Sequence, residues 1–452
     1  MSLITKAIKG TQDTLPQDSH KIRFVEATVA EIAENYGFKE IRTPVFEHTE
    51  LFDRSVGDTT DVVQKEMYTF ADKGGRSVSL RPEGTAGTVR AFLEHGLFND
   101  PAPQKLYYLT SCYRYEKPQA GRLREFHQFG VECFGTESPA EDAEIIALAD
   151  EVFGFLGLKD ISLEINSIGC PSCRPKYQQA LKDYFTSRKE DLCDTCKGRL
   201  DKNPMRILDC KDPGDAAIAA EAPVVLDYLC PECREHFETV QTYLKAMQLD
   251  YTVNPRIVRG LDYYTKTVFE FVSTGIGAQG TVCGGGRYDG LCEELGGKPT
   301  PALGFGMGLE RLMLLLEAQN VALPEAAHPA LYLASAGPAA SVKACQLAHD
   351  LRSEGVSVLF DTYGRSIKAQ MKYANKVGAD FVVVLGDNEL ESGTVNLKNM
   401  QTGEEQEMSL DGFAENFSNV SLQQMMASLG AELADADGAE EFDISKFLGG
   451  TF

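Results

Sequence analysis

The sequence predicts an α+β fold in residues 1–322, interrupted by a helical insertion and followed by a separate α/β domain. Two extended segments joined by a turn at Pro118–Gly121 predict a β-hairpin within residues 106–134. Residues 168–250 hold seven of the twelve cysteines and mostly short helical patterns, which indicates an inserted module. Farther along the chain, strand and helix patterns alternate, as is typical of an α/β domain.

Size, charge and cysteine usage restrict the class of protein. The 452 residues suffice for two or three domains, each with its own core. A net charge of −23 argues against indiscriminate nucleic-acid binding, because most of the surface would repel phosphates. No apolar run approaches the roughly 18 residues of a membrane span, and the N-terminus lacks the apolar core of a signal peptide. We therefore expect a cytoplasmic protein with reduced thiols and no membrane contact.

The first fifty residues predict a helix and an edge strand. Apolar residues recur at helical spacing from Ser19 to Tyr36, and Gly37 ends the helix. Residues 40–47 then predict a strand that contains Pro44, which is tolerated mainly at sheet edges because it cannot donate a backbone hydrogen bond. A helix beside such a strand indicates either a dimer interface or simple protection of a sheet edge.

A strand that leads directly into a helix offers a first candidate ligand site. Strand patterns at 67–70 and 77–80 precede Glu83, Gly84 and Thr85, where a helix to residue 95 begins. This arrangement presents backbone N–H groups, a hydroxyl and a carboxylate at a helix N-terminus. Taken alone, such residues more often form an ordinary helix cap than a site, and both interpretations stay open.

One face of the predicted hairpin carries an unusual mixture of side chains. Strand alternation brings together, in its second segment, Arg122, Arg124, Phe126, Gln128, Gly130 and Glu132. In the first segment, Arg114 and Glu116 also share a face. A solvated sheet face is the general alternative, but a phenylalanine and a glycine among arginines favour a site for a polyanion, a flat ring and a cationic group. Arginine forks bind phosphate oxygens in pairs, and a phenylalanine can stack on a base.

The elements after the hairpin follow in order. The patterns predict a helix at 141–156, a strand at 161–166, the insertion, strands at 256–264 and 268–272, and a glycine-rich turn at 283–290 from which Arg287 and Tyr288 project. Glycines then alternate at 304, 306 and 308 in a predicted strand, so one of its faces lacks side chains and a planar ring can approach the backbone. A helix from Leu309 places Arg311 in its first turn, where a cation opposes the helix dipole and needs an anionic or aromatic partner.

The last domain is predicted to span residues 328–420. Its expected strands lie at 330–335, 356–361, 381–385 and 395–398, and its helices at 340–354 and 366–377. The second helix carries Arg365, Lys368, Lys372 and Lys376 beside Tyr363 and Tyr373, with no acidic residue among them. This pattern indicates either a solvated basic face or an RNA contact. Residues 421–452 predict an acidic, mostly mobile tail to which we assign no function.

Three of these blocks resemble the motifs of class II aminoacyl-tRNA synthetases. Residues 41–47, the hairpin from Arg114 to Glu132, and residues 304–311 correspond to motifs 1, 2 and 3. Residues 259–264 and 284–288 are similar to the histidine-specific motifs of the histidyl-tRNA synthetases. The likeness extends from residue 5 to residue 420, and the combination of motifs is highly specific.

The resemblance implies an architecture and a reaction. It implies a six-stranded antiparallel catalytic sheet built from residues 1–167 and 251–322, the helical insertion at 168–250, a homodimer and a C-terminal anticodon-binding domain. The implied enzyme is a ligase that uses ATP, with Mg²⁺ bridging the phosphates, to convert L-histidine to histidyl-adenylate. It then transfers histidine to the 3′ end of tRNA(His).

The resemblance also implies roles for single residues, all carried over by motif. Histidine would be contacted by Glu83, Gly84, Thr85, Arg114, Gln128, Glu132, Arg259, Tyr263, Tyr264 and Tyr288. In that set Glu83, Thr85 and Gln128 would hold the α-amino group, and Glu132 and Tyr264 would recognise the imidazole. ATP would be held by Arg114 at the α-phosphate, by Glu116 and Phe126 at the adenine, and by Arg122 and Arg311 at the distal phosphates and ring.

The implied catalytic residues are Arg259 and Arg114, with Arg259 lying against the carboxylate and the α-phosphate. Gln119 in the hairpin turn would approach the acceptor end of the tRNA. Arg365, Lys368 and Lys372 are the candidate contacts of the last domain with tRNA.

The insertion departs from the family pattern by its cysteines. Three C-x₂-C pairs lie within 64 residues, at Cys170–Cys173, Cys193–Cys196 and Cys230–Cys233, with Cys210 nearby. Two such pairs can form a tetrahedral structural zinc site, and the sequence leaves open which two. Reduced, partly buried cysteines without metal are the alternative.

Two rival functions remain to be weighed. A synthetase-like regulatory subunit of histidine biosynthesis would share the fold, but such proteins generally lack the last domain and the block at Arg259, and both are present. A class II synthetase for another amino acid is disfavoured by the set Glu132, Tyr264 and Tyr288.

Overall fold

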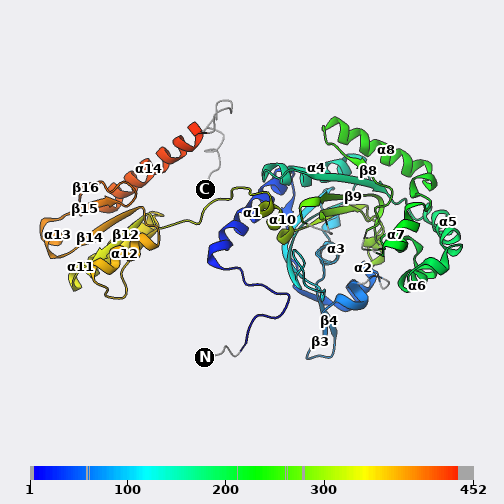
Figure 1. The fold of residues 1–452 in the computed structure, drawn as a ribbon, viewed down its shortest axis with the longest axis horizontal. Helices are drawn as coiled ribbons and strands as arrows, with labels where there is room; N and C mark the ends of the chain where they lie inside the picture. The colour runs from blue at the N-terminus through cyan, green and yellow to red at the C-terminus, as the bar shows by residue number, and fades with distance from the viewer. Residues whose placement is uncertain are drawn as a thin grey trace. The chain divides into compact units, whose positions relative to one another are not determined.

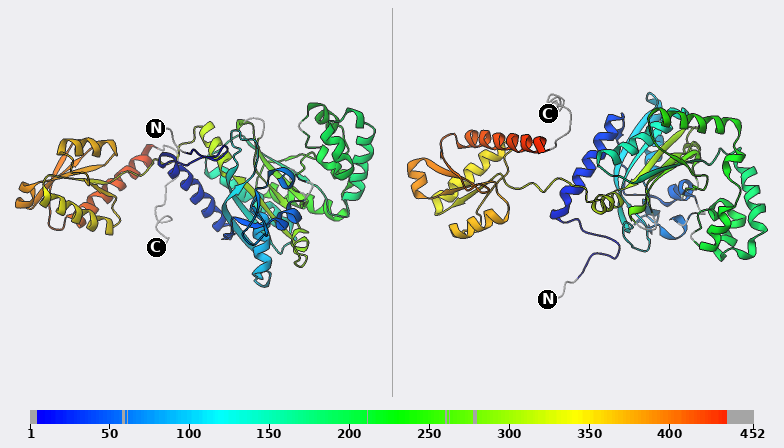
Figure 2. Two further views of the ribbon diagram at one scale, coloured as in Figure 1. Left: turned by 90° about the horizontal axis from the view of Figure 1, so that it is seen from below. Right: turned by 45° about the horizontal axis from the view of Figure 1, so that its top comes forward.

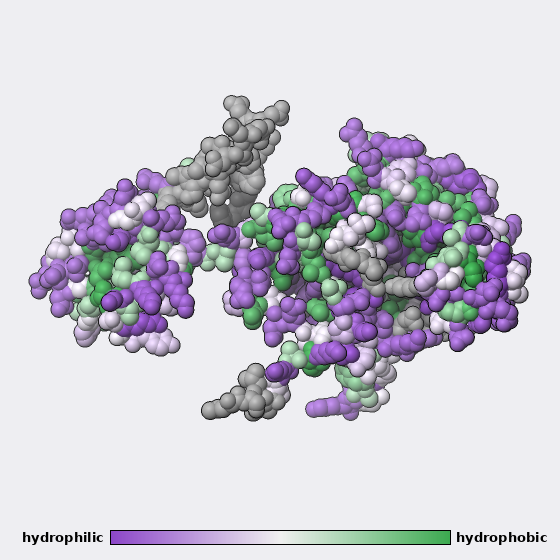
Figure 3. Space-filling model, in the orientation of Figure 1, coloured by the Kyte–Doolittle hydropathy of each residue, from purple (hydrophilic) through white to green (hydrophobic). Residues whose placement is uncertain are grey.

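The computed structural model describes residues 5–57, 60, 62–210, 212–259, 261, 263–276 and 280–435. The chain forms two compact units, Met1–Glu325 and Ala326–Phe452. Hydrophilic side chains cover much of the visible face of each unit (Figure 3). Among the residues described, no helix has the length and apolar character needed to cross a bilayer.

The first unit is built on one eight-stranded sheet (Figure 1). Its strands lie in the order β1 (Lys39–Glu40), β5 (Gln104–Tyr113), β6 (Glu125–Phe134), β11 (Ala302–Gly308), β10 (Thr281–Arg287), β9 (Thr265–Ser273), β7 (Ile161–Ser167) and β8 (Thr252–Val253). The six strands from β5 to β7 are antiparallel, as expected. The expected count of six was too low, because two-residue strands add parallel pairings at both edges.

Four helices pack on one face of this sheet and form the main core with it. They are α1 (Pro16–Asn35), α4 (Pro139–Phe155), α8 (Pro231–Ala246) and α10 (Leu309–Ala318). From β6, the side chains of Phe129, Val131 and Cys133 enter this core. Strand alternation therefore turns Gln128, Gly130 and Glu132 to the other face, as the sequence predicts.

The segment after β1 differs from the prediction. Residues 40–47 do not form one strand, because β1 ends at Glu40 and β2 (Phe46–His48) belongs to a separate three-stranded sheet with β4 (Ser77–Leu80) and β3 (Thr69–Ala71). The guanidinium of Arg81 donates to the carbonyl oxygens of Thr43 and Pro44 at 2.8 and 3.1 Å, so a side chain replaces a neighbouring strand there. α2 (Thr49–Val56), the π-helical turn Val62–Glu66 and α3 (Thr85–Glu94) complete this region.

The insertion is helical, as predicted. It contains α5 (Arg174–Thr186), α6 (Asp194–Lys202), the 3₁₀ turn η4 (Pro204–Ile207) and α7 (Pro213–Ala220), with further 3₁₀ turns at Lys189–Asp191 and Val225–Tyr228. These elements share a small apolar cluster of their own and lie together at one end of the unit (Figures 1 and 2). The following helix α8 instead packs on the main sheet through Phe237, Val240 and Leu244.

Two predictions downstream of the insertion were wrong. No strand covers residues 256–264 among those described: the carbonyl of Ile257 accepts from Asn166, and Arg256 donates to Ala220 and Ala222. The predicted glycine-rich turn is instead strand β10. A Cβ on Gly285 would overlap the carbonyl oxygen of Gly304, so glycine is required by the close neighbouring strand rather than by a turn. α9 (Leu291–Glu294) follows.

The second unit is an α/β domain. Its five strands lie in the order β13 (Val358–Phe360), β12 (Leu331–Ser335), β14 (Phe381–Leu385), β15 (Thr394–Asn399) and β16 (Glu405–Ser409). α11 (Pro338–Ser353) and α12 (Ile367–Lys376) match their predicted positions, whereas β16 and α13 (Asp387–Ser392) were not predicted. α14 (Phe413–Asp435) carries the backbone into the predicted tail as a helix, and the rest of that tail lies outside the described residues.

Candidate active site

Three glycines in register form the floor of the candidate site. Gly130 of β6 pairs with Gly306 of β11, which pairs with Gly284 of β10. Tyr108 of β5 and Glu270 of β9 are the next residues in the same row on either side. The row therefore has no side chains at its centre and larger polar groups at both ends.

The bare floor is covered by side chains of the site itself. A Cβ on Gly130 would overlap the ring of Tyr108, one on Gly306 the amide of Gln128, and one on Gly304 the carboxylate of Glu132. The guanidinium of Arg259 lies over Gly284, with Nη2 at 2.5 Å from such a Cβ. At Gly304 and Gly306 the expectation of a strip left open for a planar ring is corrected, because these glycines make room for Glu132 and Gln128, as Gly284 does for Arg259. The Cβ position of Gly308 has only Cγ of Arg311 near it, at 4.0 Å.

Glu132 is the buried centre of a hydroxyl cluster. Its carboxylate accepts from Oγ1 of Thr85 at 2.6 Å, from the hydroxyl of Tyr108 at 3.1 Å, and from the hydroxyl of Tyr288. Burial raises the pKa of Glu132 to about 8, although the hydrogen bonds from Thr85 and Tyr288 oppose this shift. A fully buried carboxyl with hydroxyl partners can recognise a ring nitrogen by a hydrogen bond.

Tyrosine rings line the same pocket. The rings of Tyr263 and Tyr264 lie 4.7 Å apart, and those of Tyr263 and Tyr288 lie 5.5 Å apart. Burial raises the pKa of Tyr264, the Arg259 cation lowers it, and the Glu132 carboxylate raises it further. The guanidinium carbon of Arg259 lies 5.7 Å from the centre of the Tyr264 ring.

Glu83 closes the pocket at the start of α3. Its carboxylate accepts from the backbone N–H groups of Thr85 and Ala86 at 2.6 and 2.8 Å, so it does act as a helix cap. The N–H of Gly84 donates to Oε1 of Gln128 at 3.1 Å, which ties the helix start to β6. Burial raises the pKa of Glu83, while the two N–H donors oppose this. The same residues therefore cap helix α3 and lie at the candidate site.

Arg259 is paired with a carboxylate that the sequence reading did not single out. Its Nη1 forms an ion pair with Glu270, whose other oxygen accepts from Oγ1 of Thr281 at 2.8 Å. Nε of Arg259 is buried and has no hydrogen-bond partner among the described residues. A held guanidinium with an unused donor is suited to an anionic ligand.

The other arginines gather beyond the hairpin strands. Nε of Arg114 donates to the carbonyl of Pro82 at 2.8 Å, and its guanidinium carbon lies 5.4 Å from the centre of the Phe126 ring. Arg122 forms an ion pair with Glu116 at 2.9 Å, and Nε of Arg122 is buried without a hydrogen-bond partner among the described residues. The residues with expected roles at ATP thus lie together.

Arg311 connects the two groups of arginines. Burial lowers the pKa of Arg311, Arg122 and Arg114 lower it further, and Glu116 and Glu270 oppose them. Nη1 of Arg311 also donates to the carbonyl of Thr281, whose hydroxyl donates to Glu270, the partner of Arg259. The rings of Tyr264, Tyr263 and Tyr288 form a continuous path from Arg259 to Glu132, and Arg114 bonds the carbonyl of Pro82, next to Glu83 and the Thr85 that bonds Glu132. The structure therefore brings Arg114, Arg259 and Glu132 into one site.

Several residues of the region were missed or misplaced by sequence reasoning. Tyr108 and Glu270 were not identified, although a single glutamate between Phe269 and Phe271 was a usable signal. Arg287 was expected to project from a turn, but it is fully buried and pairs with Asp142 at 2.6 Å behind the site. Tyr288 alone of that pair joins the pocket.

The candidate tRNA contacts lie elsewhere. Gln119 forms an isolated β-bridge with Arg122 in the hairpin turn. In the second unit, Lys368 and Lys372 are exposed on α12. Arg365 pairs with Asp361 at 3.2 Å, and its guanidinium lies against the rings of Tyr363 and Tyr373. The side chain is therefore held against the surface of the domain and does not project from it.

The six predicted metal ligands divide into two clusters. Cys170, Cys173, Cys230 and Cys233 have their sulfur atoms within 4.8 Å of one another. Within this cluster Sγ of Cys170 lies 3.6 Å from Cys173 and 4.0 Å from Cys230. The remaining pair does not join them: Cys193 and Cys196 lie with Cys210 and Asp215.

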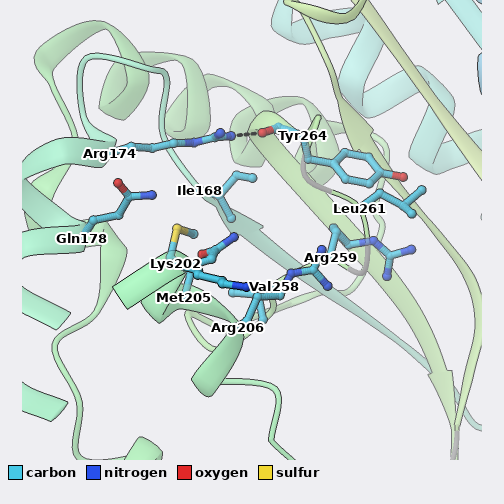
Figure 4. A pocket seen from close by; sticks show the side chains of 11 residues that line it. Ile168, Arg174, Gln178, Lys202, Met205, Arg206, Val258, Arg259, Leu261 and Tyr264 are labelled. Atoms are coloured by element: carbon cyan, nitrogen blue, oxygen red, sulfur yellow. Dashed lines mark hydrogen bonds between the residues drawn. The ribbon is translucent and has the colours of Figure 1, made fainter. Parts of the chain in front are cut away.

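A cavity of about 280 Å³ lies between the insertion and the site (Figure 4). Arg174, Lys202, Arg206 and Arg259 line it, and no acidic side chain is among the described lining residues. Arg174 donates to the carbonyl of Tyr264, which links α5 of the insertion to a tyrosine of the pocket. This cavity is suited to an anionic group that reaches the site from the insertion side.

Comparisons with known proteins assign the two units. Residues 10–312 match the family model of histidyl-tRNA synthetase, and residues 331–419 match that of an anticodon-binding domain. Histidine–tRNA ligases of Acetivibrio thermocellus and Caldanaerobacter subterraneus subsp. tengcongensis are 55% and 56% identical to this chain, each match covering 90% of it and 98% of the relative.

Solved structures agree with these relatives. The apo S. aureus histidyl-tRNA synthetase superposes with a TM-score of 0.79 at 40% identity, covering 92% of this chain and all of that one. A Bacillus halodurans protein described as an ATP phosphoribosyltransferase regulatory subunit/histidyl-tRNA synthetase shares the fold at 22% identity, with a TM-score of 0.59. On the identity, coverage and family match together, the chain belongs to the histidyl-tRNA synthetase family.

Proposed function

We propose that the glycine-floored site binds histidine and ATP side by side and joins them as histidyl-adenylate. By its family the chain is an aminoacyl-tRNA ligase that charges tRNA with histidine. The observation that carries the proposed site is that Glu132, Arg259 and Arg114 lie around one floor: Thr85 bonds Glu132, Arg259 lies over Gly284, and Arg114 bonds the carbonyl of Pro82 beside Glu83.

Histidine would occupy the pocket over the floor. In this proposal Glu132 and Tyr264 bind the two imidazole nitrogens, and Tyr263 and Tyr288 enclose the ring. Glu83, Thr85 and Gln128, with the backbone of Gly84, hold the α-amino group. Supporting this, hydrogen bonds from the Tyr108 and Tyr288 hydroxyls fix the Glu132 carboxyl, and tyrosine rings lie around it. A similar-sized apolar side chain would form no hydrogen bond with the buried Glu132 carboxyl, which is a strong basis for discrimination.

ATP would occupy the arginine side of the site. We assign the α-phosphate to Arg114, the adenine to Phe126 and Glu116, and the distal phosphates to Arg122 and Arg311. The buried, unpartnered Nε atoms of Arg122 and Arg259 support an anionic occupant. Mg²⁺ would enter with the phosphates, because no cluster of metal-binding side chains lies in this site among the described residues.

The reaction requires positioning and charge neutralisation. An oxygen of the histidine carboxylate bonds to the α-phosphorus, and the bond from that phosphorus to the pyrophosphate oxygen breaks. Arg259 and Arg114 hold the carboxylate and the α-phosphate together and stabilise the charge that develops. A hydroxyl of the terminal tRNA adenosine then attacks the acyl carbon and AMP leaves.

The remaining partners are assigned on separate observations. We propose that the cationic cavity at Arg174 and Arg206 admits the acceptor end of tRNA(His), and that Lys368 and Lys372, beside Arg365, meet the tRNA in the anticodon-binding unit. Gln119, which lines a different cavity, would approach the acceptor end from the hairpin turn. We place the enzyme in the cytoplasm, where tRNA is charged.

A homodimer is proposed from exposed apolar residues of the three-stranded sheet β2-β4-β3. Three apolar side chains are exposed on or beside the small sheet: Val45 at 41%, Phe46 at 57% and Phe70 at 49%. An exposed group of apolar side chains marks a surface that a partner covers. Sedimentation should give twice the chain mass, and replacing Phe46 and Phe70 with serine should shift it toward the monomer. A wild-type monomer at micromolar concentration would reject this assembly.

Zinc is proposed for the four-cysteine cluster. The tetrahedral edge for a zinc–sulfur bond length of 2.3 Å is about 3.8 Å, and the measured sulfur distances of 3.6 and 4.0 Å lie on either side of it. Cys173 and Cys230 are the N-cap residues of α5 and α8, so the metal would join the insertion to the main body.

ATP–pyrophosphate exchange tests the proposed activation step. Exchange should be stimulated by L-histidine and by none of the other standard amino acids. Stimulation by another amino acid would reassign the pocket, and stimulation by none would favour a regulatory role.

A further inference from the structure

The second cysteine cluster has the geometry of a metal site. Cys193, Cys196 and Cys210 each offer a sulfur, and Asp215 an oxygen, all within 4.8 Å of one another. Sγ of Cys193 lies 4.0 Å from Sγ of Cys210, close to the tetrahedral edge of about 3.8 Å for zinc thiolates. All three thiols are free rather than paired as disulfides.

Asp215 has an oxygen that is left without a partner. The side chain is fully buried, and Oδ1 accepts from the backbone N–H of Cys193 at 2.9 Å. Oδ2 is buried with no hydrogen-bond partner among the described residues. An unpartnered carboxylate oxygen among three thiols is costly unless a cation neutralises it, and a carboxylate oxygen is an accepted fourth ligand of zinc.

The backbone around the cluster favours anionic ligands. Cys193 is the N-cap of α6, and its sulfur accepts from the N–H of Cys196 at 3.5 Å. Asp215 lies in the first turn of α7. The positive ends of two helices thus meet at the cluster, as they do at the four-cysteine cluster.

We propose that Cys193, Cys196, Cys210 and Asp215 bind a second Zn²⁺, separate from the four-cysteine site. Thiolates prefer zinc to the hard cations Mg²⁺ and Ca²⁺, and four protein ligands leave no open position for catalysis. The site is therefore structural, and it stabilises a module whose apolar cluster is small.

The ligands flank the part of the insertion that lines the cationic cavity. Cys196 precedes, and Cys210 follows, the segment from Lys202 to Arg206, which contributes one wall of the cavity. The N–H of Cys210 also donates to Ile207 at the end of η4. The second zinc would hold this wall opposite Arg259. This consequence rests on the proposed function, whereas the metal content does not.

Metal analysis of the full-length chain, expressed without added metal and exhaustively desalted, tests the site. Wild type should contain two zinc equivalents, and Cys210→Ser and Asp215→Asn should each contain one. Cys230→Ser should also contain one, and the matched control Cys345→Ser, an exposed cysteine of the second unit, should retain two. A wild-type protein without zinc overturns the second site, and so does a wild-type zinc content that Cys210→Ser and Asp215→Asn both retain in full.

A functional readout separates this inference from the proposed activity. Asp215→Asn should leave histidine-dependent pyrophosphate exchange within about threefold of wild type and raise the KM for tRNA at least fivefold. If Cys210→Ser does not fold, the zinc contents of wild type and of Asp215→Asn still show whether the second site binds zinc. Two zinc equivalents without histidine-dependent exchange would uphold the site while rejecting the proposed function.

Discussion

At Glu132, burial and hydrogen bonding act in opposite directions. The carboxyl is fully buried, and its pKa is raised from 4.5 to about 8 in the folded enzyme. The folded state therefore holds a proton that the unfolded chain releases near pH 4.5. The contribution to stability is complete below pH 4.5 and is lost as pH rises through 8.

This titration predicts a pH dependence that one substitution removes. Wild type should lose about 2–3 kcal/mol of unfolding free energy from Glu132 between roughly pH 6 and pH 8. Glu132→Gln has no such titration, so its stability should rise relative to wild type over this range. Urea unfolding of both proteins at several pH values measures the difference. A constant difference across the range would contradict the raised pKa.

Arg259 tests the proposed chemistry most directly. Arg259→Ala should fold and slow histidine-dependent pyrophosphate exchange by roughly 10² or more, the scale for loss of a preorganised charge donor. Arg256→Ala is the matched control, because Arg256 bonds the carbonyls of Ala220 and Ala222 and has no assigned role at ATP. Near-wild-type exchange by Arg259→Ala would refute the role.

Some residues of the candidate site could be predicted from the sequence and others could not. Period-two alternation placed Gln128 and Glu132 correctly, because β6 is regular and one face packs in the core. Glu270 was missed because its role depends on a partner eleven residues earlier in an irregular segment. Cys210 and Asp215 could not be grouped with Cys193 and Cys196, because helices of the insertion, not sequence spacing, bring them together.

Among the elements, β10 and β11 show why local patterns misled. The strand at 304–308 was predicted from alternating glycines, whereas Gly284 to Gly286 suggested a turn. In the sheet these consecutive glycines satisfy two demands: Gly284 admits Arg259 on one face, and Gly285 avoids the backbone of β11. The segment at 256–264 has the composition of a strand, but its hydrogen-bond partners are not those of a sheet. The carbonyl of Ile257 accepts from Asn166 of β7, and Arg256 donates to Ala220 of the insertion.

The floor strand predicts a strict requirement for glycine. Gly304→Ala would place a methyl group on the Glu132 carboxylate and the Val131 carbonyl, so we expect loss of histidine-dependent exchange by at least 10²-fold and a lower melting temperature. Gly154→Ala is the control: nothing lies within 4 Å of that Cβ, and alanine in helix α4 should stabilise by up to about 1 kcal/mol. Calorimetry and exchange assays check both. An active Gly304→Ala enzyme would contradict the described packing.

At the scale of the whole molecule, the proposed active site lies entirely in the first unit. A fragment of residues 1–325 should keep histidine-dependent exchange within about tenfold, because neither ATP nor histidine needs the second unit in our proposal. Charging of tRNA(His) should fall much further, by 10²-fold or more, as anticodon-side contacts are removed. Aminoacylation and exchange measured on the same fragment separate the two effects. Equal losses in both would show that the second unit supports activation as well.

The run of glycines across β6, β11 and β10 also limits how this enzyme could be redesigned. A floor already filled by the enzyme's own amide, carboxylate and guanidinium offers no space that a smaller or larger residue could reshape. Altered substrate choice must therefore come from the tyrosines that line the pocket. Tyr263 is the one to shorten, because the Tyr264 ring lies against Arg259 and the Tyr288 hydroxyl bonds Glu132.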